Sequence, residues 1–440
     1  MYSTDKVVYY SQTPLIPDRA IQFSIEQLTG GISGVIKRFD PREGHQHVTP
    51  SPEPKRYDGA ETMLPQSRPL IEVLAEIPDF RHHRGKRHPL APMLALACSA
   101  MLCGYRSYTA IAEWGRNYGA HLTRALGFTR QPPCAATLHT VFRRVDREVL
   151  EAKVGAWAEG LLAGTPVPPD TAEVIAVDGK TLRGSKKQGA PAAHLLSALA
   201  PRLGLTLAQQ AVADKTNEIP MALELLRHVL LEGRVVTMDA LLTQRPLAQQ
   251  IVDAGGDYVM MVKDNQPQLR EDIMTVFALP PIAGETRTVA ETVDSGHGRI
   301  EQRRLQTSDV LVGYSDWPGM AQVFQVERHV LIKKTGEVRE EVVAGVTSLA
   351  PECADAPRLL ALIRGQWLIE NQSHWVRDVT FDEDRSQVRC GNIPQVMATF
   401  RNTAIGLMRK AGYTNIAATC RRFAAQPALA LELIGIELEN

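Results

Sequence analysis

The sequence is short of cysteine and shows no excess of charge of either sign. Among 440 residues, 49 Lys and Arg balance 49 Asp and Glu, so whole-chain charge does not by itself indicate a nucleic-acid partner. The six cysteines are scattered, which excludes a dense disulfide framework and is typical of reduced thiols in the cytoplasm. Cys98 and Cys103 lie near His82, His83 and His88 in the sequence, but their spacing fits no standard zinc site.

We expect neither a secretion signal nor a membrane-spanning run. Its start, "MYSTDKVVYYSQTPLIPD", has neither the basic beginning nor the unbroken apolar stretch of a signal peptide. One uncharged run, Pro89 to Tyr105, approaches the length of a membrane span, for which about 20 apolar residues are needed. Because the run contains two prolines, Ser99 and Gly104, we expect a buried helix in a soluble, cytoplasmic protein with no membrane partner.

Composition divides the first part of the chain in two. Residues 1–70 are expected to form a poorly ordered extension and linker, because 37–69 is rich in Pro, Glu, Arg and His. Residues 71–165 carry apolar side chains three and four positions apart, which predicts a small helical domain. Within 71–150, eleven Lys and Arg against six Asp and Glu give a net charge of +5. A solvated helical bundle would fit this pattern, but the charge favours a DNA-binding domain. The expected phosphate contacts are Arg81, Arg84, Lys86 and Arg87.

Residues 171–410 alternate strands and helices. Three strands are predicted in "EVIAVDG", "AHLLSALAP" and "GLTLAQQAVA". A helix, a strand, a helix and a strand follow in "IPMALELLRHVLLEG", "RVVTMDAL", "QRPLAQQIVDAGG" and "DYVMMVKDNQ". This order predicts an α/β fold with a ribonuclease-H-like mixed sheet. We also expect a β-rich insertion at about 285–350, a long helix from about Pro357, and a helical tail over 411–440.

Two aspartates end apolar strands in this α/β region. Asp178 precedes a glycine, and Asp-Gly between extended segments is a strong signal for a two-residue hairpin turn. A turn does not explain Asp239, which ends the strand "RVVTM" and leads into a helix. Since ligand sites in open sheets lie beyond the carboxyl ends of parallel strands, we expect the two aspartates to share a site.

A third carboxylate, Glu370, continues an apolar stripe of the long helix. A carboxylate on the inward face of a helix is costly unless it is paired or bound to a metal. An ion pair with Arg377 is one explanation. The other is that three carboxylates converge from two strands and a helix to form an oxygen-rich site suited to Mg²⁺. Two such ions would stabilise the attacking and leaving oxygens of a phosphoryl displacement.

Five motifs taken together resemble those of the H-repeat-associated transposases of bacterial insertion sequences, which belong to the DDE transposase group. They are "VDGKTLRGS", "TMDALLTQ", "YVMMVKDNQ", "SGHGRIEQRR" and "IENQSHWVRDVTFDEDRS", within about residues 71–410. The resemblance implies that Asp178, Asp239 and Glu370 form the catalytic and metal-binding triad. It implies two Mg²⁺ ions, for which Mn²⁺ substitutes. In the wider group a tyrosine and an arginine precede the glutamate and a lysine follows it; here Ile363, Gln366 and Arg377 occupy those positions.

The resemblance also implies the reaction and the partners. The reaction is metal-dependent hydrolysis of a phosphodiester at the ends of a mobile element, followed by strand transfer into target DNA. The partner is double-stranded DNA, both terminal inverted repeats and target, bound by a homodimer. Two alternatives stay open: a catalytically silent DNA-binding protein of transposon origin, and a nuclease that cuts without joining.

Further DNA contacts are expected at polar residues inside these motifs. They are Lys180, Arg183, Lys263, Asn265, His297, Arg299 and Arg377. A polar loop is an alternative for Lys263 and Asn265, and a hairpin tip is an alternative for His297 and Arg299. Trp367 and Trp375 could stack on an extruded base, but packing in the helix core is the interpretation that we favour.

Overall fold

The computed structural model of the protein describes residues 68–168, 171–186, 191–212, 218–296 and 298–438. The expected N-terminal extension over 1–70 therefore lies almost wholly outside the described residues, and so does His297. Among the residues described, no helix is both long enough and apolar enough to cross a bilayer.

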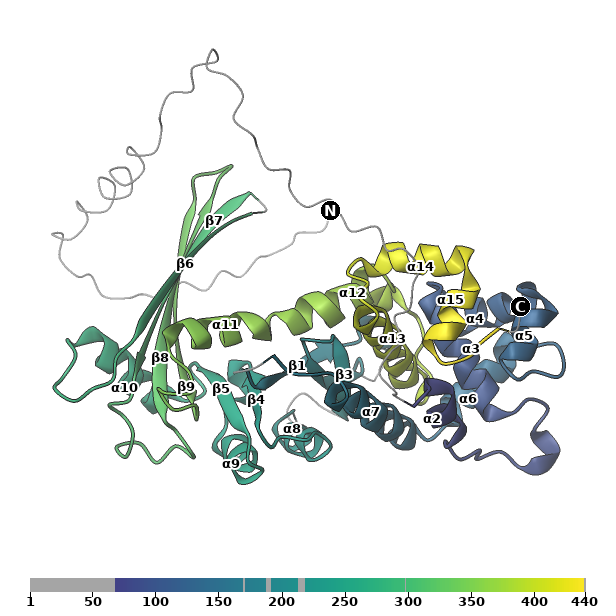
Figure 1. Ribbon diagram of the computed structural model, residues 1–440, viewed down its shortest axis with the longest axis horizontal. Coiled ribbons are helices and arrows are strands. Elements are labelled where there is room, and N and C mark those ends of the chain that lie inside the picture. Colours follow the sequence, from purple (N-terminus) through teal and green to yellow (C-terminus); the bar gives the residue numbers. More distant parts are fainter. Residues whose placement is uncertain (1–67, 169–170, 187–190, 213–217, 297, 439–440) are drawn as a thin grey trace, which may run out of the picture. The chain divides into compact units, whose positions relative to one another are not determined.

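The chain begins with a group of helices (Figure 1). They are α2 (Leu70–Ala75), α3 (Leu90–Leu102), α4 (Tyr108–Asn117), α5 (Gly119–Ala125), α6 (Ala135–Arg144) and α7 (Arg147–Ala163). Their starts follow local rules: Ser107 Oγ accepts a hydrogen bond from the Ala110 N–H, and Asp146 accepts from two N–H groups at the start of α7. The uncharged run forms α3, which is buried almost throughout, as expected for a core helix.

Helices from the end of the chain complete the same hydrophobic core. They are α13 (Ile393–Lys410), α14 (Ile416–Ala425) and α15 (Pro427–Leu433). One cluster of buried apolar side chains runs from Leu70 to Val154 and from Val376 to Ile436. The residues expected to form a helical tail, 411–440, pack with the N-terminal helices, and α13 links both groups to the sheet.

The α/β part is built on a mixed sheet, which confirms the predicted ribonuclease-H-like fold class. Its first strands are β1 (Glu173–Thr181), β2 (His194–Ala200), β3 (Leu205–Val212), β4 (Arg234–Met238) and β5 (Asp257–Val262). The order is β3-β2-β1-β4-β5, in which β1, β2 and β3 are antiparallel and β1, β4 and β5 are parallel. The carboxyl ends of β1 and β4 therefore meet at one edge of the sheet.

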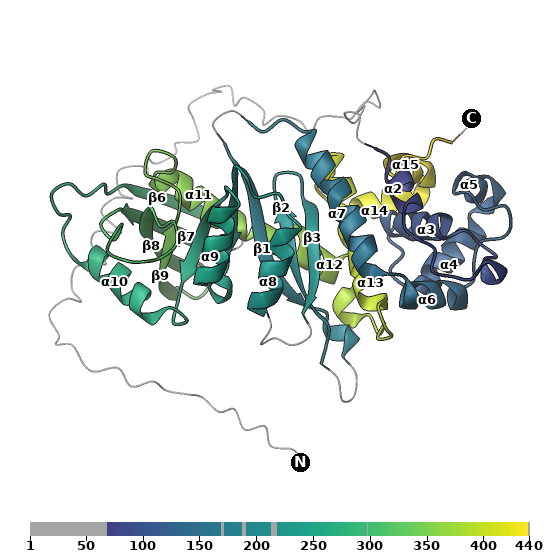
Figure 2. The same ribbon diagram turned by 90° about the horizontal axis from the view of Figure 1, so that it is seen from below.

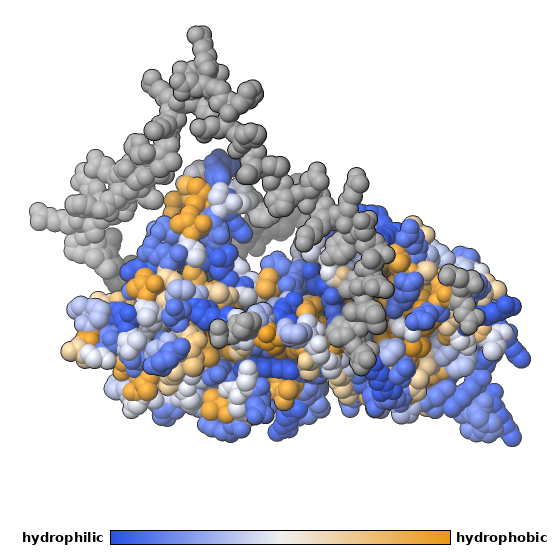
Figure 3. Space-filling view, viewed as in Figure 1, coloured by the Kyte–Doolittle hydropathy of each residue, from blue (hydrophilic) through white to orange (hydrophobic). Residues whose placement is uncertain are grey.

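The β-rich insertion continues this sheet. Its strands are β6 (Val289–Gly296), β7 (Arg299–Ser308), β8 (Gln322–Ile332) and β9 (Val338–Thr347). Strand β9 pairs antiparallel with β5, and β8, β7 and β6 follow in turn. Near the free end of this ribbon, valine side chains such as Val293 and Val338 are exposed, and Figure 3 shows apolar surface there among hydrophilic residues.

Helices cover both faces of the sheet. On one face lie α7, α8 (Glu218–Arg227) and α9 (Arg245–Asp253), as Figure 2 shows. On the other face, α11 (Ala356–Gln366) buries Leu359 and Leu360 against side chains of β4, β5 and β7. A helix that the sequence interpretation missed, α10 (Pro267–Ala278), follows β5 and packs against β8 and β9.

The long helix expected from Pro357 is not continuous. After α11 ends at Gln366, the segment η5 (Glu370–His374) is a π-helical turn, and α12 (Trp375–Val379) follows it. A π turn inserts one residue relative to α-helical spacing and often marks a functional site. Side chains beyond Glu370 therefore do not continue the stripe that regular 100° spacing predicts.

Candidate active site

The two aspartates are placed by the parallel pairing of β1 and β4. The last residue pair of this register is Val177 with Met238, and Asp178 and Asp239 come directly after it. Strand β1 does not end there, because Asp178 lies opposite Ser197 in β2 and the strand runs on to Thr181. The hairpin-turn interpretation of Asp178 is therefore wrong.

Hydrogen bonds fix the loop that carries Asp239. The Asp239 carboxylate accepts from the Ala240 N–H at 2.7 Å and caps a short 3-10 helix, η4 (Ala240–Leu242). The side-chain amide of Asn265 donates to the carbonyls of Ala240, at 2.7 Å, and Thr243, at 3.2 Å. These contacts give Asn265 a role in fixing the Asp239 loop, and the phosphate contact expected for it stays a prediction.

Glu370 is brought to the aspartates by contacts immediately before it in the chain. Ile369 is buried against Ala176 of β1 and Leu199 of β2. One turn earlier, Gln366 donates through Nε2 to the carbonyl of Val177 and accepts through Oε1 from Thr237. The helix is thus tied to β1 and β4 at the residues that precede the two aspartates.

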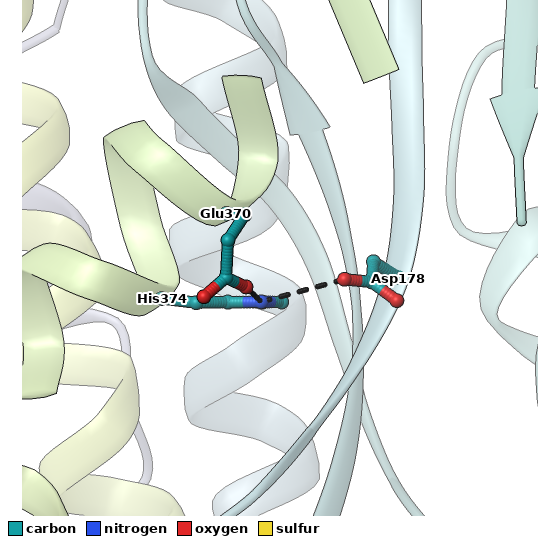
Figure 4. Close-up of side chains that lie close together, drawn as sticks. All are labelled: Asp178, Glu370 and His374. Atoms are coloured by element: carbon teal, nitrogen blue, oxygen red, sulfur yellow. Dashed lines mark hydrogen bonds and ion pairs between the residues drawn. The ribbon is translucent and has the colours of Figure 1, made fainter. Parts of the chain in front are cut away.

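A histidine that the sequence interpretation did not assign lies between the carboxylates. His374 Nδ1 is 3.0 Å from Glu370 Oε2 and 3.5 Å from Asp178 Oδ2, and its ring is buried. Figure 4 shows Glu370 and His374 extending from one helical segment toward Asp178 on β1. Ligand atoms of these three residues lie within 4.8 Å of one another. The signal for His374 is its position four residues after Glu370.

The electrostatics of Asp178 and Glu370 differ. Burial raises the pKa of the Asp178 carboxyl, and the nearby charges of Asp239 and Glu370 raise it further, against the opposing effect of His374. The hydrogen bond with His374 lowers the pKa of Glu370, which is more exposed. Asp178 is thus a buried carboxyl with two further carboxylates nearby, an arrangement that a divalent cation would stabilise in its charged form. This acidic cluster has the hard-oxygen donor set that fits such a cation.

All three acids line a single pocket of about 460 Å³. Apolar side chains of β5, β8 and α11, among them Val259 and Ile363, form part of its wall, and Lys263 is one of its cations. The Trp367 ring lines the pocket, is 49% exposed, and has the guanidinium of Arg328 at 4.9 Å. Trp375 is 54% exposed. The expectation that both tryptophans pack in the helix core is wrong.

Two residues expected to bind DNA are buried in ion pairs. Arg377 is fully buried and pairs with Glu383 at 2.8 Å, and Arg401 pairs with the other oxygen of the same carboxylate. Lys180 is also buried and its Nζ lies 2.5 Å from Asp378. Since these cations are withdrawn from the surface, both DNA-contact expectations are corrected, and Arg377 is not the ion-pair partner of Glu370.

The other expected DNA contacts lie at or near the surface. Arg84, Lys86, Arg87, Arg183, Lys263 and Arg299 are exposed. Arg81 is less available, because its guanidinium is bound to Asp79 and donates to the carbonyl of His88. Their contact with DNA stays a prediction.

Comparison with known proteins assigns the chain to a family. Residues 169–407 match the family model described as "Transposase DDE domain". Residues 71–158 match the model described as "DDE_Tnp_1-associated". Because the first match spans more than half of the chain, the chain belongs to the family of proteins with a transposase DDE domain. The predicted family is confirmed.

Similar proteins come from bacteria. The "H repeat-associated putative transposase YhhI" of Escherichia coli (strain K12) is 28% identical over 77% of this chain and 90% of that protein. An "Uncharacterized protein in dhlA 3'region" of Xanthobacter autotrophicus is 36% identical over 62% of this chain and 91% of that protein. A solved piggyBac transposase synaptic complex with hairpin DNA aligns with a TM-score of 0.40 and 10% identity, covering 82% of this chain and 78% of that one.

Proposed function

We propose that this protein is a metal-dependent DNA transposase that cleaves the ends of a mobile element and joins them to target DNA. The observation that carries the proposal is the convergence of Asp178, Asp239 and Glu370 on one pocket, in a chain of the transposase DDE domain family. The three carboxylates would hold two Mg²⁺ ions, with Mn²⁺ as a substitute. Bound there, the ions supply the positive charge that stabilises the attacking and leaving oxygens of a phosphoryl displacement.

The chain's own residues orient the reacting groups. In the first step, the oxygen of a water molecule bonds to phosphorus, and the bond from phosphorus to the 3′ oxygen breaks. The 3′ oxygen takes a proton from that water and leaves as a 3′-hydroxyl, and the water oxygen stays on the 5′-phosphate. In the second step, that hydroxyl oxygen bonds to a target phosphorus and displaces a target 3′ oxygen, which leaves with a proton. Gln366 fixes the position of Glu370, while His374 Nδ1 bridges the carboxylates of Glu370 and Asp178. The Lys263 ammonium at the pocket is available to a phosphate.

The helical part is proposed to bind double-stranded DNA at the element's terminal inverted repeats. Arg81, Arg87 and Arg116 line one hollow of about 180 Å³. Burial lowers the pKa of His88 beside them, and the charges of Arg87, Arg81 and Arg116 lower it further, which reflects a concentrated positive field. Such a field attracts phosphate. Following the resemblance to H-repeat-associated transposases, we propose that two copies act together on DNA in the cytoplasm.

The test uses DNA with the inverted repeats that flank the gene, a supercoiled target, and Mg²⁺ or Mn²⁺. The native protein is expected to cut and join, whereas Asp178→Asn and Glu370→Gln lose both activities and bind Mn²⁺ more weakly by calorimetry. Asp264→Asn removes the same charge from a side chain that is 97% exposed, and it should retain activity.

Each alternative function has its own outcome in this experiment. Cutting without joining would identify a nuclease, and DNA binding without either step would identify a silent DNA-binding protein. A Glu370→Gln protein that melts earlier but still cuts DNA would contradict the three-carboxylate site.

A further inference from the structure

A second groove adjoins the acidic pocket on the other side of the helix that carries Glu370. It has a volume of about 660 Å³ and is lined by the α3–α4 turn, η5, α12, the end of α13 and one side of α14. Asn371, the residue after Glu370, lines both the acidic pocket and this groove. The two hollows are therefore neighbours, joined at one residue beside the expected metal ligands.

The charged residues that line this groove are all positive. Its charged lining residues are Arg106, Arg409 and Arg421, and the described residues that line it include no Asp or Glu. Burial lowers the pKa of Arg409, whose Nε donates to the carbonyl of Gln372. Arg106 has a carboxylate, Asp382, at 3.8 Å, a distance at which an exposed pair contributes little. An anion in the groove would thus meet three guanidinium groups.

An aromatic surface accompanies these charges. Trp375 lines the groove, and its side chain is 54% exposed although it lies in the middle of a packed helical segment. Exposed tryptophans beside arginines form the combination on which single-stranded nucleic acids bind, with bases on the ring and phosphates at the cations. The volume lies in the range of ligand pockets, and it is far too small for a duplex.

We propose that this groove binds a single-stranded segment of DNA next to the scissile phosphate, with a base stacked on Trp375 and a phosphate bound by Arg421. The inference rests on the proposed function and extends it, since it gives the strand that leaves the acidic pocket a path across Asn371. A transposase that separates strands at the element's end needs such a surface to hold the freed nucleotides.

The experiment measures binding of a fluorescein-labelled oligothymidylate of about 20 nucleotides by anisotropy, in EDTA, at several salt concentrations. Arg421→Gln should reduce the slope of log affinity against log salt by about 0.7, the value for one phosphate contact on a single strand. Arg422→Gln is the matched control: Arg422 is the next residue on α14, is exposed, lies over the Tyr413 ring and does not line the groove. Its slope should match that of the native protein.

Trp375 is tested with a second pair of variants. Trp375→Ala should weaken oligonucleotide binding about 5- to 150-fold, the loss expected for one stacked base, with the salt slope unchanged. Trp375→Tyr keeps an aromatic face and should restore most of the affinity. Thermal unfolding of each variant checks that the fold is intact.

Three outcomes would overturn the inference. The first is an equal reduction of the salt slope in Arg421→Gln and Arg422→Gln. The second is a Trp375→Ala protein that binds the oligonucleotide as tightly as the native protein does. The third is that the variants change binding to blunt duplex DNA but not to the oligonucleotide. Because EDTA removes divalent metal, these measurements do not depend on catalysis. A native protein that cuts and joins DNA but does not bind the oligonucleotide would refute the groove alone. A native protein that binds the oligonucleotide through Trp375 and Arg421 but does not cut would refute the proposed function alone.

Discussion

The Gln366 side chain donates a hydrogen bond of 2.9 Å to the main-chain carbonyl of Val177, the residue before Asp178. Its other terminal atom accepts a hydrogen bond from Thr237 Oγ1 of β4. A single side-chain amide thus bridges the parallel strands β1 and β4. It contacts β1 one residue before Asp178 and β4 two residues before Asp239, and Gln366 itself lies four residues before Glu370. This amide therefore helps to position the helix on the two strands.

Replacing Gln366 is therefore expected to disturb the site without removing a ligand. Gln366→Ala should lower the free energy of unfolding by about 1–3 kcal/mol, because buried hydrogen-bonding groups on both strands lose their partner. It should also weaken Mn²⁺ binding measured by calorimetry. Gln249→Ala on α9, which removes an exposed amide whose contact is with Asp253, serves as the control. Unchanged Mn²⁺ affinity in Gln366→Ala would show that the amide does not position Glu370.

His374 provides a second, sharper test of positioning. Since its Nδ1 faces two carboxylates, which accept hydrogen bonds, Nδ1 is the protonated ring nitrogen. His374→Asn places an amide N–H near the Nδ1 position, and His374→Gln places it nearer Nε2. We expect His374→Gln to weaken Mn²⁺ binding about 10- to 100-fold, as changes behind metal ligands do, and His374→Asn to weaken it less. Equal affinity of the two variants would contradict a role for Nδ1.

Much of the fold follows from local patterns in the sequence. Strands β1 to β5 were predictable because each is a short apolar run that ends at polar or turn-forming residues, as "RVVTM" ends at Asp239. The β ribbon was predictable from its alternation of polar and apolar residues. Helix α10 was missed because only Leu269 and Ile273 are buried along it, so its apolar face is narrow.

The site was less predictable, because tertiary contacts decide it. The π turn at Glu370 depends on how Ile369 and Gln366 dock on the sheet, and regular helical spacing does not show it. Sequence alone also cannot separate a surface cation from a buried one. Lys180 and Arg377 follow Asp178 and Glu370 in the sequence, where a DNA contact would be expected. In the structure Lys180 is buried against Asp378, which is distant in the sequence, and Arg377 is buried against Glu383, which is close in the sequence.

The buried ion cluster behind the site is expected to dominate local stability. Burial alone would raise the pKa of Glu383, but the charges of Arg377 and Arg401 outweigh it and lower that pKa. Glu383→Gln leaves two buried guanidinium groups without their counter-charge, which should cost about 3–5 kcal/mol in the free energy of unfolding. Urea denaturation measures the loss.

The control for this cluster is its neighbour in the sequence. Asp382 has a left-handed backbone (φ 53°), a conformation that asparagine tolerates well. Asp382→Asn removes the same charge from a partly exposed side chain and should change stability by no more than about 0.5 kcal/mol. Equal effects of the two substitutions would mean that the buried pairs contribute nothing specific.

Glu151 on α7 gives the protein a stability that depends on pH. Burial raises the pKa of its carboxyl to about 7, against the hydrogen bond from Gln209, which favours the charged form. The folded protein therefore binds this proton more tightly than the unfolded chain, whose carboxyl has a pKa of about 4.3. The stabilisation is complete below the unfolded pKa, declines as the pH rises, and is lost above about 7.

Glu151→Gln removes this penalty, because glutamine stays neutral and its carbonyl can still accept from Gln209. At pH 8 the variant should be more stable than the native protein by at most about 4 kcal/mol, and the difference should shrink toward pH 5. Melting temperatures across this range measure the effect. Glu148→Gln, on the same helix but with a side chain 76% exposed, should show no such trend. A pH-independent difference between native and Glu151→Gln proteins would mean that the carboxyl is ionised in the fold as it is in the unfolded chain.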